Sequence, residues 1–539
     1  MQQAMEHLRA GRLPEAEALY RLVLEDKPGD PDAMRLLALV YYNQGVDRHA
    51  LGRLDAAAED YLRSISLNPR DARVHSNLGV LLQTQGKLDE ASASYQQAIA
   101  LDPADARAHA NIAVVLEAKG DMDAAIEHYR RSLALDPDEP RTYNNLGNAL
   151  RSMELLDEAI ACLRRAVELM PGYAEAYSNL GNAQKDRGQL DAAIASYNTA
   201  LALNPGSVDA EWNRGLAFLM LGRLEEGWAG YDMRFRRSDH VGGYRGHLTG
   251  KPAYAGESLQ GKTLLVWPEQ GLGDEVVHAG TLPDVVRATG HCIVECDPRL
   301  VPLFARSFPD AEIIPKCEPP HPRTLEGDID WQCPVGSLHR YFRPTVASFP
   351  SQPGHLVPCN DRVAFWKQRL DALGPSPKVG ISWRSRHRST SRDLQYTELE
   401  QWGQVLSIPG LTFINLQYDE CRTELAQARQ AFGVEVHAWG DLDQMKDIDD
   451  LAALMKAVDL VIGPTTAATL LAAAVGVPAW MMVTRDIIWQ QLGTEVIPML
   501  PALVPIWRAR NTTWGSVLDE VAARLRREVL HEGRHDGHS

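Results

Sequence analysis

Small, apolar and polar residues recur with a fixed spacing along the first part of the chain. Prolines stand 34 residues apart at Pro69, Pro103, Pro137, Pro171 and Pro205. In three of the periods a Leu-Gly pair comes first; a single glycine follows in three, and then an alanine followed by a ring or a leucine. A period of 34 predicts a helix–turn–helix unit that stacks into a solenoid. Gly79, Gly147 and Gly181 are expected where the two helices of a unit touch. Gly86, Gly120 and Gly188 are expected to end the first helix in a left-handed turn.

This pattern resembles the tetratricopeptide repeat (TPR). Residues 4–33 form a degenerate first repeat, and the second repeat is seven residues longer than the others. We place the excess near residues 43–50, between the two helices of that repeat. The seventh unit, residues 206–235, lacks the closing proline and is expected to end the solenoid.

One asparagine in each period occupies the same position. These residues are Asn77, Asn111, Asn145, Asn179 and Asn213. An amide is a poor helix former, but it can hydrogen-bond a peptide backbone whatever that peptide's side chains are. The row resembles the asparagine ladder of the O-GlcNAc transferase family, which holds extended polypeptide. We therefore predict that the five asparagines bind a polypeptide. The alternative is that each amide bonds a neighbouring helix and fixes the packing of the repeats.

From residue 262 onward short apolar strands alternate with helices, which predicts parallel sheets covered by helices. The expected fold class is an all-α TPR superhelix followed by an α/β region with two Rossmann-like domains. The expected boundaries are a repeat domain at 1–235, a glycine-rich linker at 236–260, a first α/β domain at 261–372, a second at 373–530 with a helix that packs back on the first, and a disordered tail at 531–539.

Composition limits the function classes. The net charge of −16 over 539 residues argues against non-specific nucleic-acid binding. The seven scattered cysteines are expected to be reduced. The N-terminus has no secretory signal pattern, and Gly476 and Pro478 interrupt the most apolar run, residues 467–483. These features predict a cytoplasmic protein with neither a membrane span nor a nucleic-acid partner.

Three segments of the α/β region resemble GT-B glycosyltransferases of the heptosyltransferase type. They are Gln-Gly-Leu-Gly-Asp at 270–274, Val-Gly-Ile-Ser-Trp-Arg at 379–384, and Asp-Leu-Val-Ile-Gly-Pro-Thr-Thr at 459–466. The order of TPR repeats before a GT-B half resembles O-GlcNAc transferases and bacterial TPR-containing protein glycosyltransferases, including enzymes that modify flagellin. The resemblance implies two Rossmann-like lobes with a ligand cleft between their sheets.

On the first lobe, Gly271 and Gly273 would let the backbone approach a ligand. The resemblance implies that Asp274 is the general base that deprotonates the acceptor hydroxyl; the alternative is a helix N-cap. His278, one turn later, is a second candidate base, or else a histidine that lines the cleft. Glu275 is expected to be solvated.

On the second lobe the expected donor-binding residues follow strands. The basic loop contributes Ser382, Arg384, Arg386 and Arg388, because arginine binds phosphate and carboxylate; the alternative is a solvated loop. Gln417 could contact the nucleotide or the sugar, or pack at a strand end. Pro464, Thr465 and Thr466 precede a helix whose free N–H groups suit a phosphate, the alternative being simple capping.

The resemblance therefore implies a protein O-glycosyltransferase that transfers a sugar from a nucleotide-sugar to Ser or Thr of a polypeptide held by the repeats. Flagellin is the acceptor it suggests. The excess of arginine suggests an acidic donor, such as a nonulosonic acid carried on CMP. No catalytic metal and no cofactor beyond the nucleotide-sugar are expected. Two alternatives stay open: a non-catalytic TPR adaptor or chaperone, and an enzyme that glycosylates a lipid or glycan.

Overall fold

A computed structural model describes residues 1–237, 249–269, 271–385, 395–484, 488–509 and 512–531. The chain divides into two compact units, Met1–Arg187 and Gly188–Ser539. The division falls inside the sixth repeat rather than at residue 235, so the last repeat helices group with the α/β region. Arg386 and Arg388, two of the expected donor ligands, and Gln270 lie outside the described residues.

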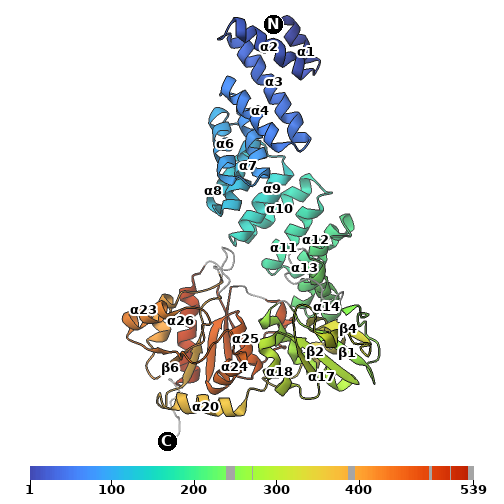
Figure 1. Cartoon of the computed structure of the whole chain (residues 1–539). Coiled ribbons are helices and arrows are strands. Elements are labelled where there is room, and N and C mark those ends of the chain that lie inside the picture. Colours follow the sequence, from blue (N-terminus) through green and yellow to red (C-terminus); the bar gives the residue numbers. More distant parts are fainter. Residues whose placement is uncertain (238–248, 270, 386–394, 485–487, 510–511, 532–539) are drawn as a thin grey trace. The chain divides into compact units, whose positions relative to one another are not determined.

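The first unit is entirely helical (Figure 1). Its helices are α1 (Gln2–Arg9), α2 (Leu13–Asp26), α3 (Pro31–Ala50), α4 (Leu54–Leu67), α5 (Ala72–Thr84), α6 (Leu88–Leu101), α7 (Ala106–Lys119), α8 (Met122–Leu135), α9 (Pro140–Ser152), α10 (Leu156–Leu169) and α11 (Ala174–Asp186). The predicted pairs of helices are confirmed. We expected the seven extra residues between the two helices of the second repeat. Instead they lengthen the first of these helices, α3, to 20 residues, against 13 in α5.

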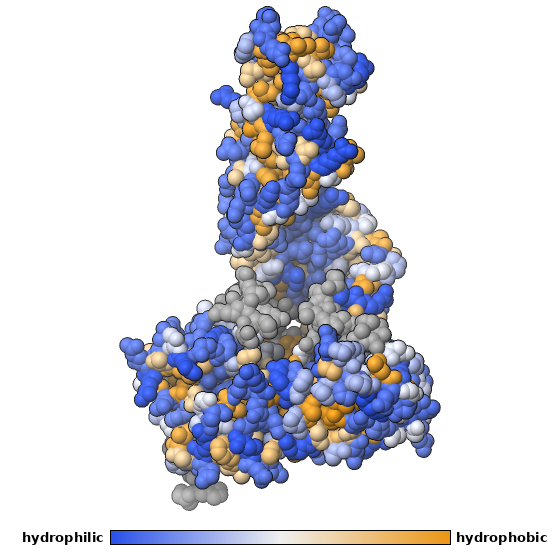
Figure 2. Space-filling model, in the orientation of Figure 1, coloured by the Kyte–Doolittle hydropathy of each residue, from blue (hydrophilic) through white to orange (hydrophobic). Residues whose placement is uncertain are grey.

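The repeat glycines have the roles that the pattern predicts. A Cβ atom on Gly79 of α5 would lie 2.7 Å from the ring of Tyr95 on α6, so only glycine lets the two helices pack this closely. Gly86 and Gly120 have φ angles of +75° and +86°, which favour glycine. Figure 2 shows that the visible face of these helices carries mainly hydrophilic residues with small apolar groups between them.

The second unit begins with the remaining repeat helices and continues into two lobes. The repeat helices are α12 (Leu190–Leu203), α13 (Val208–Met220) and α14 (Leu224–Tyr231), followed by a 3-10 helix, η1 (Asp232–Arg236). Leu216, Trp228 and Tyr231 belong to the same hydrophobic core as Leu264 and Val266 of the first lobe. The hairpin formed by α13 and α14 is therefore packed into the α/β region.

The first lobe contains a parallel sheet in the order β3-β2-β1-β4. Its elements are β1 (Thr263–Trp267), α16 (Leu272–His278), η2 (Ala279–Thr281), α17 (Leu282–Ala288), β2 (His291–Cys296), η3 (Pro298–Leu300), α18 (Val301–Ser307), β3 (Glu312–Pro315), η4 (Pro322–Leu325), β4 (Trp331–Pro334), η5 (Val335–Leu338), α19 (His339–Phe342) and η6 (Val346–Ser348). The helix α20 (Asn360–Asp371) follows and packs on the second lobe. In the predicted linker, Tyr254 is buried and its N–H donates to Gln332 O, so the described part of that segment packs on this lobe.

The second lobe contains a parallel sheet in the order β10-β9-β8-β5-β6-β7. Its elements are β5 (Lys378–Ile381), η7 (Leu399–Trp402), α22 (Gly403–Leu406), β6 (Thr412–Asn415), α23 (Arg422–Phe432), β7 (Val436–His437), α24 (Ile448–Ala457), β8 (Leu460–Pro464), α25 (Ala467–Ala474), β9 (Ala479–Val483), η8 (Trp489–Gln491), β10 (Leu503–Trp507), α26 (Trp514–Arg524) and a π-turn, Leu525–Val529. The last helix, α26, packs against this sheet and not against the first lobe, which corrects our expectation.

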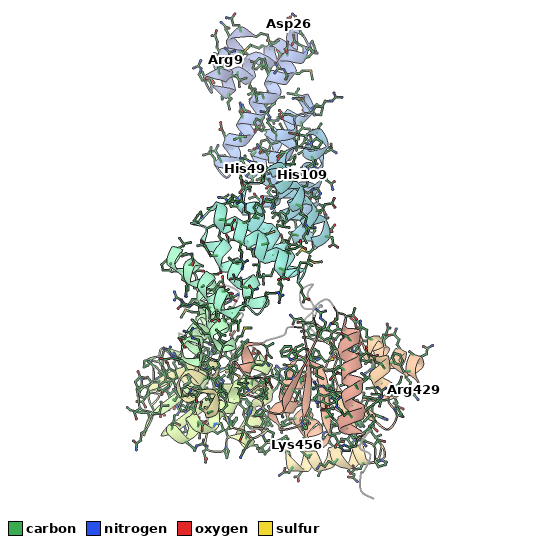
Figure 3. All side chains as sticks on the ribbon, turned by 180° about the vertical axis from the view of Figure 1, so that it is seen from behind. Arg9, Asp26, His49, His109, Arg429 and Lys456 are labelled. Carbon is green, nitrogen blue, oxygen red and sulfur yellow. The ribbon has the colours of Figure 1, made fainter. Side chains whose placement is uncertain are left out.

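Two contacts on α24 organise the second lobe. Asp450 accepts bonds from Arg362 and Trp366 of α20, at 2.7 and 2.8 Å. Lys456, which Figure 3 labels, donates to Val475 O at 2.9 Å and so connects α24 with the end of α25. Both sheets are parallel and covered by helices, so the α/β expectation is confirmed at this level.

Candidate active site between the two lobes

Two strand-to-helix turns meet at the centre of the second unit. One leads from β1 through Gly271 into α16, and the other leads from β8 into α25. A Cβ atom on Gly273 would lie 3.1 Å from Leu470 Cδ1 and 3.6 Å from the Cα of Ala467, so the two helices come together at this glycine. The segments predicted to bind acceptor and donor are therefore neighbours.

A cavity of about 380 Å³ lies beside this contact. Its walls come from both lobes: Gly271, Leu272, Glu275, Arg299 and Lys316 from the first, and Tyr418, Gln444, Ile448 and Ala467 from the second. The volume is within the range of small-molecule sites, and a crevice at the carboxyl ends of parallel strands is where open α/β sheets bind ligands.

The cations of the cavity differ in how they are held. Arg299 bonds Asp297 at 2.8 and 2.7 Å and donates to Met445 O at 3.0 Å, so its charge is largely matched by a neighbour. The Lys316 ammonium makes no hydrogen bond or ion pair with any described residue. Lys316 is therefore the cation that an anionic ligand could engage.

Glu275 lies inside the cavity, contrary to our expectation that it is solvated. It is 4% exposed, and one carboxyl oxygen accepts the Asp297 N–H at 2.8 Å. Burial raises the pKa of Glu275 to about 8, with that N–H opposing the rise. At neutral pH the carboxyl is protonated and can donate a hydrogen bond. The helical spacing that puts Glu275 beside Leu272 would have indicated this face.

Asp274 lies on the other side of the same turn. Gly271, not Asp274, is the N-cap of α16, so Asp274 occupies the first turn without capping it. Its side chain reaches water, but the surrounding protein desolvates the carboxyl and raises its pKa to about 6. The negative charge of Glu269 adds to the rise, and Arg234 opposes it. A carboxyl with this pKa suits proton transfer near neutral pH.

His278 does not line the cavity. It is 1% exposed, and its two ring nitrogens contact Tyr231 Oη at 3.2 Å and His339 Nε2 at 2.8 Å. Burial lowers the pKa of His278 to about 4, so the ring is neutral. Because both nitrogens are engaged inside the protein, the geometry argues against the predicted role of a second base.

Two of the described donor residues of the second lobe, Arg384 and Gln417, are bonded internally. The Arg384 guanidinium pairs with Asp419 at 2.8 Å and Glu424 at 3.0 Å. Gln417 is 2% exposed; its carbonyl accepts the N–H groups of Trp383 and Arg384, and its amide donates to Arg384 O and Asp419. Gln417 thus has the packing role that we gave as its alternative, and Arg384 is charge-matched. Ser382 is also buried.

The Pro464-Thr465-Thr466 turn leaves the start of α25 open. Thr466 occupies the N-cap position, but its side chain makes no capping bond; its hydroxyl lies 3.3 Å from Thr469 Oγ1. Thr465 is exposed, and Pro464 is buried at the end of β8. Thr466 therefore does not cap the helix through its side chain, which was the alternative role. Ala467 and Ala468, in the first turn of α25, line the cavity.

The asparagine row is half-buried in the first unit. Asn77 donates to Tyr42 Oη at 3.1 Å and Asn179 to Asn144 Oδ1 at 2.9 Å, each reaching the equivalent helix of the preceding repeat. Asn145 accepts weakly from Asn144 at 3.5 Å, whereas Asn111 bonds no described residue.

Asn213 belongs to the second unit. It is buried and donates to Asp209 O at 3.0 Å. Asn77 and Asn179 thus contribute to repeat packing, as the alternative proposed, whereas the Asn213 bond stays within α13. The binding of polypeptide by the asparagine row stays a prediction. Asn144, which follows no strict period, escaped the sequence pattern.

Two features are absent from the described part of the chain. No cluster of three His, Cys, Asp or Glu side chains there is suited to hold a metal ion. Its helices include none whose length and apolar content would allow it to cross a membrane. All seven cysteines carry thiols; four are buried and Cys317 is exposed.

Comparison with known families identifies the repeats. A tetratricopeptide repeat model matches residues 77–140, and a second TPR model matches residues 47–86, 147–186 and 181–222. The N-terminal half therefore consists of TPR repeats. Protein FlbA of Caulobacter vibrioides is 38% identical over 291 residues, an alignment that covers 51% of this chain and 48% of FlbA. The chain thus spans about half the length of this relative.

Among solved structures, MamA is 24% identical, with 31% of this chain and 92% of MamA covered and a TM-score of 0.30. YrrB, a TPR protein, is 27% identical, with 34% of this chain and 95% of YrrB covered and a TM-score of 0.31. PilF of Pseudomonas aeruginosa is 23% identical, with 39% and 92% covered and a TM-score of 0.31.

Proposed function

We propose that the α/β region is a metal-independent GT-B glycosyltransferase and that the TPR repeats bind its polypeptide acceptor. The observation that carries the proposal is the cavity between two parallel-sheet lobes, lined by Gly271 and Leu272 of the turn from which Asp274 extends. The resemblance of residues 270–274 and 459–466 to heptosyltransferase-type enzymes gives the Asp274 carboxyl its role. The same resemblance suggests flagellin as the acceptor.

In the proposed reaction, Asp274 accepts the proton of a Ser or Thr hydroxyl. The hydroxyl oxygen attacks the anomeric carbon of the sugar, the bond from that carbon to the phosphate oxygen breaks, and the nucleotide leaves with the bonding electron pair. Lys316 and the uncapped N–H groups of α25 would stabilise the charge on the leaving phosphate. Because the base must be ionised, the rate is expected to rise with pH through about 6.

The test is transfer of sugar in the full-length chain. Flagellin and a panel of UDP-, GDP-, ADP- and CMP-sugars would be incubated with the protein, and the acceptor would be weighed by intact mass spectrometry. Asp274→Asn should reduce the rate at least 100-fold, as expected for loss of a general base. Asp310→Asn, an exposed carboxylate of the same lobe, is the matched control and should keep full activity. Equal rates in both variants would reject Asp274 as the base.

A second function has one observation in its favour. Arg384 and Gln417, two predicted donor ligands, are already satisfied by bonds within the protein. This is what a TPR adaptor with a non-catalytic α/β half would show. Nucleotide binding separates the two: if none of the four nucleotides raises the melting temperature, the adaptor is the better account.

A further inference from the structure

A buried ion pair links the last repeat hairpin to the turn that carries Asp274. Arg234 of η1 is 6% exposed and Glu269, just after β1, is 5% exposed. The guanidinium meets the carboxylate at 2.6 and 3.2 Å, and the Gly336 N–H donates to the same carboxylate at 2.9 Å. Breaking such a pair would leave a charge without its partner inside the protein.

Further contacts hold Arg234 in one position. Its guanidinium carbon lies 4.2 and 3.9 Å from the ring centroids of Tyr231 and Phe235. Its Nη atoms also donate to Tyr231 O and to Ser337. Stacking together with hydrogen bonds in the guanidinium plane fixes an arginine far better than a surface pair does.

A second buried set of hydrogen bonds holds the C-terminal end of α16. Tyr231 Oη, His278, His339 and Thr281 form a chain of hydrogen bonds of 3.2, 2.8 and 3.0 Å. Each neutral imidazole has one N–H, so all donors along the chain must point the same way. Trp228 stacks on His339 with ring centroids 5.0 Å apart. The hairpin and the 3-10 helix η1 that follows it thus contact both His278, after the turn, and Glu269, before it.

We propose that Arg234 is a positioning residue of the α/β site: through Glu269, the terminal repeat hairpin fixes the Gly271 turn and sets the charge of Asp274. The effect of Arg234 on catalysis rests on the proposed function. Its effect on the charge of Asp274 does not. The proposal makes the last TPR hairpin a component of the active site in addition to the end of the solenoid.

The charges around Asp274 support this assignment. Burial would raise the pKa of Glu269, but Arg234 outweighs burial and keeps it below the ordinary value, so Glu269 is anionic. The neighbouring His278 is neutral, and α25, which packs against α16, has no titratable side chain. Glu269 and Arg234 are the two charges that act on Asp274, with opposite signs.

The experiment follows the titration of Asp274 by NMR in the full-length protein labelled with 13C at aspartate carboxyls; Asp274→Asn assigns the signal. Glu269→Gln should lower the Asp274 midpoint by about one pH unit, the shift for one unit charge at roughly 10 Å and an effective dielectric constant of about 20. Arg234→Met should leave the midpoint near the wild-type value, because buried Glu269 takes up a proton without its cation and both charges that act on Asp274 are lost together. The double variant should return close to the wild-type value.

A downward shift in Glu269→Gln that is absent from Arg234→Met and from the double variant is what a merely structural role would not produce. Arg236→Met, an exposed arginine of the same 3-10 helix, is the control and should leave the midpoint unchanged. If Arg234→Met does not fold, Glu269→Gln and the double variant still decide. The proposal is overturned if Glu269→Gln leaves the midpoint within about 0.2 units. A wild-type protein without transferase activity would reject the proposed function while this titration still tests the inference.

Discussion

The buried acid in the cavity offers the sharpest test of the structure. Glu275→Gln keeps the shape of the side chain and the acceptor for the Asp297 N–H, but removes the ability to ionise. The pKa of Glu275 differs between the folded and the unfolded wild-type chain. In the folded protein burial raises its pKa to about 8, whereas its ordinary value is 4.5.

This difference in pKa determines how the stability of the folded protein changes with pH. Below pH 4.5 the group is protonated in both states and its contribution to stability is fully present. As pH rises, the unfolded chain releases the proton first, so the folded state loses stability until the pH passes about 8. A gap of about 3.5 pH units corresponds to roughly 5 kcal/mol in total and about 3 kcal/mol at pH 7. Glu275→Gln should therefore be more stable than wild type at neutral pH, and more so at pH 8.

Tryptophan fluorescence makes this measurable in the intact protein. All 12 tryptophans lie at or beyond Trp212, within the second unit, so the signal reports that unit alone. Urea unfolding of both proteins at pH 5, 6, 7, 8 and 9 would give the difference in free energy of unfolding. Glu400→Gln, an exposed glutamate of the second lobe, is the control and should follow wild type at every pH. If the difference in free energy of unfolding between Glu275→Gln and wild type does not change across this pH range, the reasoning is refuted.

Other predictions concern packing and binding. Gly79→Ala puts a methyl group 2.7 Å from the ring of Tyr95 and should cost about 1–3 kcal/mol, seen as a lower melting temperature by circular dichroism; Gly172→Ala, with open space around it, should not. Gln417→Leu leaves two N–H groups and a carbonyl without partners and should cost several times the roughly 1 kcal/mol of one hydrogen bond, measured by urea unfolding. Lys316→Met should weaken binding of pyrophosphate about tenfold by calorimetry, and an unchanged affinity would remove Lys316 from the anion site.

The repeat period allowed accurate prediction of the first unit because its contacts are local. Gly79 and Tyr95 are 16 residues apart in one repeat, so their contact follows from the period itself. The longer α3 was harder to foresee. Seven inserted residues make almost two helical turns, so the helix continues in phase where a loop was expected.

In the α/β region, a continuous apolar run marks β1 and β9 in the sequence, whereas β4 and β10 carry no such run. Pro505 interrupts the apolar residues at the centre of β10, a position where proline is unusual. Pro283, in the first turn of α17, separates this helix from α16.

The location of the site could be predicted from the sequence. The pairing and the charge of its polar side chains could not. The turns at Gly271 and Thr466 could each be placed at the carboxyl edge of its own sheet, which is where open α/β sheets bind ligands. Which polar groups remain available depends on partners far away in sequence. Gln417 is satisfied by the end of β5, and the charge at Asp274 depends on Arg234, 40 residues earlier in the chain. No sequence spacing encodes such pairs.

The exposure of Cys317 has a practical use. It is the most accessible of the seven thiols and directly follows Lys316 on the cavity wall. A maleimide dye should therefore attach there first without any engineered cysteine. Its emission would respond to occupancy of the neighbouring cavity, so a titration of unlabelled nucleotides could be read in a plate fluorimeter without an assay for the proposed reaction.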